Sequence, residues 1–349
     1  MKAMVLTGIR EMEMREVPDP KIERPSDVLV RMGAVGVCGS DVHYYTTGRI
    51  GSQIVRHPFA VGHEGAGTVV EVGSDVETLK PGDRVAIEPA MTCGRCDQCL
   101  SGRPNTCRNN RFLGCPGQAE GCLSEYIVMP AENCIPIKPG TPMEVATISE
   151  PLAIGVYAVK QSIPMAGAKV GILGMGPIGW SVMLPALHAG AAAVYGTDLV
   201  PERVALARQG GAAWVGNPGE EDVVAAILAR EPLGLDVVFE CCGKQETLDQ
   251  SLDLLKPGGK LMLIGIPEFD RISFVIDKMR RREITLCNVR RQRHCVEEAL
   301  ELIAEGKVDA GRMITHRFAF EQTKDAFDLL CRYGDGVLKA MIDFGGRSR

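Results

Sequence analysis

Four cysteines stand close together at metal-ligand spacing in the segment MTCGRCDQCLSGRPNTC. They are Cys93, Cys96, Cys99 and Cys107. Four thiolates complete the tetrahedral coordination of Zn²⁺ and leave no open position for a substrate. The spacing therefore predicts a structural zinc site that stabilises a lobe over about residues 91–110. The alternative is four free thiols in a loop, which would be easily oxidised.

A second set of candidate ligands is dispersed along the chain. Cys38 lies in GVCGSDVHYY, His63 and Glu64 lie in VGHEGAG, and Glu150 lies in SEPLAIG. One thiolate, one imidazole and one or two carboxylates suit a catalytic zinc that keeps a position for water or substrate. Spacing alone does not establish this site, because a single Cys and a single His are also common core residues.

A glycine-rich motif follows the apolar run 170–173 and opens a helical pattern that continues to residue 188. It reads Gly174-Met175-Gly176-Pro177-Ile178-Gly179. In a dinucleotide-binding turn the first glycine permits the tight turn, the second admits the pyrophosphate, and the third lets helix and strand pack closely. The phosphates would lie at the helix N-terminus. A glycine turn without a ligand is the alternative.

An acidic residue, Asp198, follows the next strand-like run, AVYGT. A carboxylate there accepts hydrogen bonds from ribose hydroxyls and repels a 2′-phosphate, which favours NAD over NADP. Arg203 is close enough in sequence to receive a 2′-phosphate and argues in the other direction. We expect Gly174, Gly176, Ile178, Gly179, Asp198 and Arg203 to form the cofactor site.

The surrounding sequence predicts two kinds of domain. Short β-like runs with turn residues fill the first part of the chain and favour a β-rich barrel or sandwich. From about Glu150, apolar strands alternate with Ala-rich helices, which indicates a doubly wound parallel sheet. We expect a catalytic domain over 1–152, an inserted dinucleotide-binding domain over 153–286, and a segment 287–349 that returns to the first domain.

Composition excludes several classes of protein. The chain has 349 residues, 45% of them apolar and 24% charged, with a net charge of −5, which is typical of a globular protein and gives no bulk positive field for nucleic acid or anionic lipid. A basic run over 278–293 is interpreted as a solvated or subunit-interface surface. The uncharged stretch 170–197 is broken by Gly and Pro and predicts a buried β-α unit rather than a membrane span. With no secretory signal and 13 cysteines, we expect a cytoplasmic protein.

Taken together, these motifs identify a family. GVCGSDVHYYTTGRIG, GHEGAGTVVEVG, PGDRVAIEP, the four-cysteine lobe, SEPLAIG and GMGPIG occur in the order seen in zinc-dependent medium-chain dehydrogenases, and the chain most closely resembles their polyol branch, such as sorbitol (L-iditol) and xylitol dehydrogenases. The resemblance covers essentially the whole chain. It implies a GroES-like catalytic domain with an inserted Rossmann domain, NAD and two zinc ions as cofactors, and a homotetramer.

The resemblance also assigns roles to individual residues. It implies that Cys38, His63 and Glu64 hold the catalytic zinc, with Glu150 at the zinc-bound water or as an exchanging ligand. It implies that Ser40 and His43 relay the alcohol proton to solvent, that Tyr44 contacts the substrate, and that Arg291 lies near cofactor and substrate. The chain departs from the branch where it reads Arg290-Arg291-Gln292 instead of the frequent Phe-Arg-Tyr. This departure admits an acidic or differently sized substrate.

Three functions follow from these features. The leading prediction is oxidation of a secondary hydroxyl of a polyol to a ketose, with hydride transfer to NAD. The second is a related zinc dehydrogenase for another secondary alcohol, such as threonine or a butanediol. The third is a non-catalytic, zinc-stabilised dinucleotide-binding protein, which would leave Cys38, Ser40, His63 and Glu64 unexplained. The sequence also leaves open whether Glu64 or Glu150 is the metal ligand at each stage of the reaction.

Overall fold

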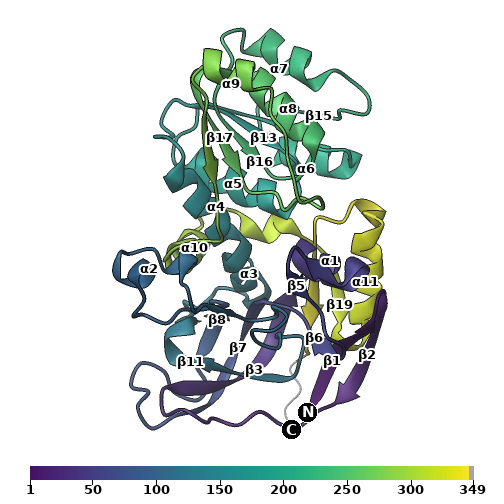
Figure 1. Cartoon of the computed structure of the whole chain (residues 1–349). Coiled ribbons are helices and arrows are strands. Elements are labelled where there is room, and N and C mark those ends of the chain that lie inside the picture. Colours follow the sequence, from purple (N-terminus) through teal and green to yellow (C-terminus); the bar gives the residue numbers. More distant parts are fainter. Residues whose placement is uncertain (346–349) are drawn as a thin grey trace. The chain divides into compact units, whose positions relative to one another are not determined.

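The computed structural model describes residues 1–345 of the chain. These residues form two compact units (Figure 1), one built from residues 1–150, 296–306 and 310 onward, the other from residues 151–295 and 307–309. Helix α4 (Ser149–Gln161) contains the first junction between them. The first unit therefore combines the N-terminal segment, purple to blue in Figure 1, with most of the yellow C-terminal segment.

A seven-stranded sheet forms the centre of the first unit, with strands in the order β12-β8-β7-β3-β20-β19 and β11 also paired with β3. A three-stranded sheet, β2-β1-β6, accompanies it. The strands of this unit are β1 (Lys2–Gly8), β2 (Glu11–Glu16), β3 (Asp27–Gly36), β4 (Arg49–Ile50), β5 (Gln53–Ile54), β6 (Phe59–Ala60), β7 (Glu64–Val72), β8 (Arg84–Ile87), β9 (Ala90–Met91), β10 (Arg111–Phe112), β11 (Tyr126–Pro130), β12 (Cys134–Pro136), β19 (Ile314–Ala319) and β20 (Lys339–Asp343). Its α-helices are α1 (Gly39–Thr47), α2 (Asp97–Leu100), α3 (Met143–Thr147), α10 (Val296–Ala304) and α11 (Thr323–Cys331).

Strand β3 lies at the middle of this sheet and pairs with β7, β11 and β20. Its apolar side chains, among them Val28, Val30 and Val35, are fully buried in the core of the unit. Strand β20 pairs antiparallel with β3, with Met341 opposite Gly36. The chain near the C-terminus is thereby brought beside the strand that leads to Cys38.

The second unit contains a six-stranded parallel sheet in the order β15-β14-β13-β16-β17-β18. Its strands are β13 (Lys169–Leu173), β14 (Ala193–Thr197), β15 (Trp214–Gly216), β16 (Leu235–Glu240), β17 (Leu255–Leu263) and β18 (Thr285–Asn288). Its remaining helices are α5 (Pro177–His188), α6 (Pro201–Gln209), α7 (Val223–Arg230), α8 (Gln245–Leu254) and α9 (Ile276–Arg281). This order confirms the predicted doubly wound sheet.

The boundary expected at residue 286 falls inside β18, the edge strand of this sheet. An edge strand has one partner strand, so its side chains stay partly exposed and need not form an apolar run. The sequence TLCN accordingly gave no strand signal. Some residues of the basic run 278–293 form ion pairs. Arg280 and Arg281 pair with Asp277, and Lys278 pairs with Asp253.

The uncharged stretch 170–197 contains most of β13, all of α5 and all of β14. Strand β14 is buried along its whole length and α5 is buried over most of its length. This confirms the predicted β-α unit. Within residues 1–345, no helix combines the length and the apolar character needed to cross a bilayer.

Candidate metal centres and dinucleotide site

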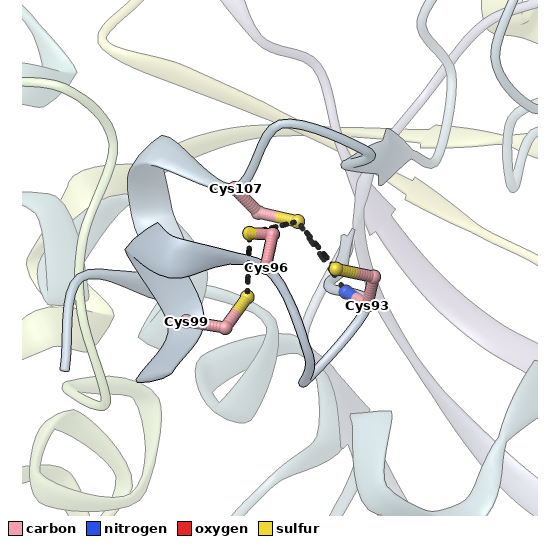
Figure 2. Close-up of side chains that lie close together, drawn as sticks. All are labelled: Cys93, Cys96, Cys99 and Cys107. Atoms are coloured by element: carbon pink, nitrogen blue, oxygen red, sulfur yellow. Dashed lines mark hydrogen bonds between the residues drawn. The ribbon is translucent and has the colours of Figure 1, made fainter. Parts of the chain in front are cut away.

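The four clustered cysteines meet in one lobe of the first unit, with their sulfurs turned toward one another (Figure 2). Cys96 caps the N-terminus of α2, and Cys107 follows a short 3-10 turn, Pro104–Thr106. The Sγ atoms of Cys96 and Cys99 are 3.5 Å apart, those of Cys96 and Cys107 3.9 Å, and those of Cys93 and Cys107 3.5 Å. A tetrahedral zinc with Zn–S bonds of about 2.3 Å places its sulfurs about 3.8 Å apart. The lobe therefore fits a zinc ion.

The chain around the lobe favours the thiolate of Cys93, whereas burial raises the pKa of the Cys99 thiol to about 12. Hydrogen bonds from the backbone at Arg95 and from the side chain of Asn109 lower the pKa of Cys93 to about 6. Arg108 makes two hydrogen bonds to Asp97, from Nε at 2.5 Å and from Nη2 at 2.9 Å, and these tie the end of the lobe to α2.

The second metal centre brings together Cys38, His63 and Glu64, each of which offers one ligand atom within 4.8 Å of the others. Cys38 caps the N-terminus of α1, directly after β3. His63 directly precedes β7 and Glu64 is its first residue, and β7 pairs with β3 so that Glu64 lies opposite Gly36. The pairing of two strands therefore unites ligands far apart in the sequence. A thiolate, an imidazole and a carboxylate are a donor set that zinc accepts.

Asp41 orients the histidine of this centre, although no sequence motif marks it as a functional residue. Its carboxylate is fully buried, accepts the backbone N–H groups of Cys38 and Gly62 at 3.1 and 3.2 Å, and lies 3.3 Å from Nδ1 of His63. With Nδ1 turned to Asp41, His63 presents Nε2 to a metal. Burial lowers the pKa of His63, but the charges of Asp41 and Cys38 outweigh burial and raise it.

Lys339 is a second residue of this centre that no sequence motif marks. Its Nζ lies 2.7 Å from both carboxylate oxygens of Glu64 and 3.2 Å from the carbonyl oxygen of Val37, and the side chains of Lys339 and Glu64 are each 1% exposed. Burial lowers the pKa of Lys339, but the nearby Glu64 carboxylate outweighs burial and raises it. Glu64 is therefore held by a buried cation as well as facing Cys38 and His63.

Glu150 lies buried at the start of α4. Its desolvation raises the pKa of its carboxyl group, and the charges of His63, Glu64 and Lys339 also act on that group. The structure thus places a second carboxyl group in the electrostatic surroundings of the Cys38, His63 and Glu64 cluster. Glu64 belongs to the cluster of candidate ligands with Cys38 and His63. Glu150 lies close enough for the charge of Glu64 to affect its pKa.

The remaining sequence-predicted residues of the first unit follow Cys38 along α1. The hydroxyl of Ser40 donates a hydrogen bond to the sulfur of Cys38 at 3.3 Å. His43 is half-buried three positions after Ser40, so the two lie on the same face of the helix. Tyr44 is buried, and its hydroxyl donates to Oε1 of Gln53 at 3.1 Å.

The glycine motif in the second unit has the geometry of a phosphate-binding turn. Gly174 has φ +96°, in the region that favours glycine, and Gly176 caps the N-terminus of α5. A Cβ on Gly179 would lie 2.0 Å from the carbonyl oxygen of Gly174, so only glycine permits this packing of α5 on the turn. The backbone N–H groups at the start of α5 are available for an anionic ligand. Ile178 is half-buried in the first turn of α5.

Asp198 directly follows β14, and its carboxylate accepts the backbone N–H of Val200 at 2.9 Å. Burial raises the pKa of Asp198. The hydrogen bond from Val200 and the charge of Arg203 act in the opposite direction and lower it in part. Arg203 is buried in α6, and its Nη1 would lie 3.5 Å from a Cβ on Gly176. The structure therefore gathers the predicted acidic and basic residues beside the glycine turn.

The predicted specificity segment also belongs to the second unit. Arg291 is half-buried with φ +52°, and Gln292 is buried with its Oε1 accepting the backbone N–H of Cys295 at 2.8 Å. The hydrogen bond to Cys295 occupies the Gln292 carbonyl oxygen within its own turn.

Comparison with known proteins agrees with both halves of this architecture. Residues 24–139 match the alcohol dehydrogenase GroES-like domain, and residues 177–305 match the zinc-binding dehydrogenase family. The chain is 36% identical over 343 residues to sorbitol dehydrogenase of Bacillus subtilis, covering 98% of this chain and 97% of that protein.

Solved structures give the same result. A zinc-binding dehydrogenase of Sinorhizobium meliloti bound to NADP superposes with a TM-score of 0.89 at 32% identity, covering 98% of each chain. A 2R,3R-butanediol dehydrogenase of Bacillus subtilis superposes with a TM-score of 0.88 at 30% identity, covering 98% of this chain and 99% of that one.

The chain therefore belongs to the zinc-dependent medium-chain alcohol dehydrogenase superfamily. It is an oxidoreductase with a GroES-like domain and a Rossmann domain, as the sequence predicted. Zinc and a nicotinamide dinucleotide are the cofactors of this family. A non-catalytic binding protein, the third sequence-based alternative, is thereby set aside.

Proposed function

We propose that this enzyme oxidises a secondary hydroxyl of a polyol to a ketose, with NAD as hydride acceptor. One observation carries the proposal: the ligand atoms of Cys38, His63 and Glu64 converge within 4.8 Å of one another. The 36% identity to sorbitol dehydrogenase of Bacillus subtilis over nearly the whole chain supports a polyol as the substrate.

Each residue of the first unit has a place in this reaction. Cys38 and His63 would hold the catalytic zinc, with Glu64 as the third ligand and Glu150 as a carboxylate that can exchange with it. When bound, zinc acts as a Lewis acid on the alcohol and NAD accepts the hydride. Asp41 fixes the tautomer of His63, and Lys339 offsets the charge of Glu64. Cys93, Cys96, Cys99 and Cys107 would hold the structural zinc.

The proton of the alcohol requires a path to solvent. The Ser40 hydroxyl, 3.3 Å from the sulfur of Cys38, lies beside the first ligand and can accept that proton while donating its own. His43, on the same face of α1, would receive the proton, since an imidazole titrates near neutral pH.

In the second unit, Gly174, Gly176, Ile178 and Gly179 would cradle the cofactor pyrophosphate. Asp198 would accept hydrogen bonds from the adenosine ribose, and its carboxylate favours NAD over a cofactor with a 2′-phosphate. Arg203 would hold the turn beside Gly176, and Arg291 would contact cofactor or substrate. We assign catalysis to residues 1–152 with 287–349, and cofactor binding to residues 153–286.

A steady-state assay tests the proposal by following NADH formation with a panel of polyols, threonine and simple secondary alcohols. We expect turnover of sorbitol, xylitol or galactitol, silence with threonine, and loss of activity after zinc is removed with a chelator. Full activity without metal would refute the zinc mechanism. A preference for NADP⁺ would refute the role given to Asp198.

A second candidate is the oxidation of a smaller secondary alcohol. The superposition on 2R,3R-butanediol dehydrogenase supports it, as does the departure at Arg290–Gln292. Turnover of 2,3-butanediol with silence on every polyol would favour this candidate. Replacing Gln292 with Tyr tests the segment directly: an unchanged substrate profile would show that Gln292 does not set specificity.

We also propose a homotetramer in the cytoplasm. Support for the compartment comes from the 13 cysteines, all of which lie within residues 1–345 and none of which forms a disulfide there. The tetramer rests on the resemblance to the polyol branch. Light scattering coupled to size exclusion would measure the mass directly, and a monomer or dimer would refute it.

A further inference from the structure

The fourth cysteine of the lobe, Cys107, is the ligand that is most distant in sequence from the others. Cys93, Cys96 and Cys99 follow one another at spacings of three residues, whereas Cys107 lies eight residues after Cys99. Closing the loop between them costs conformational entropy. In a small metal lobe, the binding of the ion commonly supplies the free energy that closes such a loop. The contacts around Cys107 provide a second source of closure.

Both neighbours of this fourth cysteine are bonded to the two residues that separate the second cysteine from the third. Arg108 donates from Nε and Nη2 to the two carboxylate oxygens of Asp97, at 2.5 and 2.9 Å. On the other side, the Thr106 hydroxyl donates to Oε1 of Gln98 at 2.8 Å. The side-chain amide of Gln98 donates to Asp97 at 3.0 Å, so the two cross-links are connected. We call these four side chains the clasp.

The clasp places the sulfur of Cys107 where a tetrahedral metal needs it. This sulfur lies 3.9 Å from the sulfur of Cys96 and 3.5 Å from that of Cys93 (Figure 2). The backbone N–H groups of Cys93 and Asn109 both donate to it at 3.4 Å. Arg108 also donates its own backbone N–H to the sulfur of Cys96. The residue that closes the clasp therefore also contacts the second ligand directly.

The exposure of the clasp limits its strength. The side chains of Arg108 and Asp97 are 67% and 54% exposed, and exposed ion pairs stabilise a protein only weakly unless their geometry is favourable. Here the guanidinium fork meets the carboxylate through two hydrogen bonds, which is the favourable case. The clasp is therefore too weak to hold the lobe against unfolding, but it can keep Cys107 close to the other sulfurs.

We propose that Asp97, Gln98, Thr106 and Arg108 are positioning residues that set how fast the lobe releases and takes up zinc. The clasp keeps Cys107 within reach of the metal whenever the bond between them opens, so this sulfur binds again before the ion is lost. It also presents an assembled set of sulfurs to an ion that returns. The inference rests on the proposed structural zinc and deepens it by naming the residues that control its exchange.

Arg108→Met tests this role, because methionine is unbranched and has no charge. The measurement uses the Cys38→Ala protein as the parent, in which we expect the lobe to hold the single remaining zinc. An excess of the chromogenic chelator pyridylazoresorcinol reports the release of that zinc. We expect release to be about fivefold faster in Arg108→Met, which is the scale of one well-formed exposed ion pair. Thr106→Val should accelerate release less, because it removes a neutral hydrogen bond.

Two further variants serve as controls. Arg281 also pairs with an aspartate, Asp277, at 2.7 Å and is 70% exposed, but it lies outside the lobe, so Arg281→Met should leave zinc release unchanged. Asp97→Asn combined with Arg108→Met should release zinc no faster than Arg108→Met alone, because the two side chains act through one contact. Release about 25-fold faster in the double variant would mean that they act independently and would overturn the inference.

The unfolding temperature of the zinc-loaded protein separates positioning from a general structural role. In Arg108→Met it should stay within about two degrees of the parent, because the metal holds the loaded lobe. A large decrease would indicate that the variant destabilises the lobe as a whole and would overturn the inference, as would an unchanged rate of release. A Cys38→Ala protein without zinc would refute the structural zinc and the clasp together. One zinc whose release is independent of Arg108 would refute the clasp alone.

Discussion

At the scale of single residues, the most demanding feature is the ion pair of Lys339 and Glu64. Both side chains are almost completely buried, and the ammonium group contacts both carboxylate oxygens and the carbonyl of Val37. Removing two charges from water is costly, and their attraction offsets this cost only when both partners are present. Each of the two charges can therefore stay buried at low cost only while the other is present.

Replacing Lys339 with Met should lower the free energy of unfolding by about 3–5 kcal/mol, because it leaves the Glu64 carboxylate buried without its cation. Adding Glu64→Gln should recover most of this loss. Denaturant unfolding of the two single variants and the double variant gives the coupling energy.

The matched control is Lys138→Met. Lys138 pairs with Glu305 at 3.6 Å, but both side chains are about half exposed, so the loss should stay below about 1 kcal/mol. Equal losses in Lys138→Met and Lys339→Met would contradict the assigned cost of the buried charge.

At the scale of elements, the turn between β13 and α5 separates two functions of glycine. Gly179 allows the helix to pack on the turn, since a Cβ would lie 2.0 Å from the carbonyl oxygen of Gly174. Gly176 has ordinary extended backbone, and a Cβ there would meet only Nη1 of Arg203 at 3.5 Å. Gly179 is therefore required for the packing of the fold, whereas Gly176 leaves room for a ligand.

Gly179→Ala should therefore destabilise the protein by about 1–3 kcal/mol, because α5 must move away from the turn. Gly176→Ala should retain wild-type stability and lose NAD affinity by at least about tenfold, because its methyl group occupies the path of the pyrophosphate. Denaturant unfolding and calorimetric titration with NAD measure the two effects. Wild-type NAD binding by Gly176→Ala would show that the cofactor does not approach the turn there.

At the scale of the whole molecule, the two metal centres differ in what they connect. The four cysteines lie within one short lobe, whereas the ligands at Cys38, His63 and Glu64 come from two paired segments of the main sheet. A metal in the lobe replaces a hydrophobic core for that segment. A metal in the sheet adds to a structure that strand pairing already holds.

We therefore expect two zinc ions per chain by elemental analysis, and one in each of two variants. Cys96→Ser should lose the lobe zinc and unfold at a lower temperature. Cys38→Ala should lose the other zinc and all turnover, with an unfolding temperature within a few degrees of the wild type. A large loss of stability in Cys38→Ala alone would contradict this division.

Local sequence patterns alone determined several structural elements of this protein. The four-cysteine lobe, the glycine turn and the helices that begin at Pro177 and Pro201 depend on residues close in sequence, so spacing and turn chemistry identified them. The dispersed ligands were found through their motifs and the resemblance, because no local rule links Cys38 to His63.

Tertiary structure alone decided the groups around those ligands. Asp41 has an ordinary place in a helical first turn, and only the approach of Gly62 and His63 gives it a second role. In the sequence, Lys339 is a single charged residue in an otherwise apolar strand. Its partner, Glu64, is 275 residues away. Such groups are selected by the cost of burying charge and polar atoms without partners, and that cost exists only after the sheet has brought the segments together.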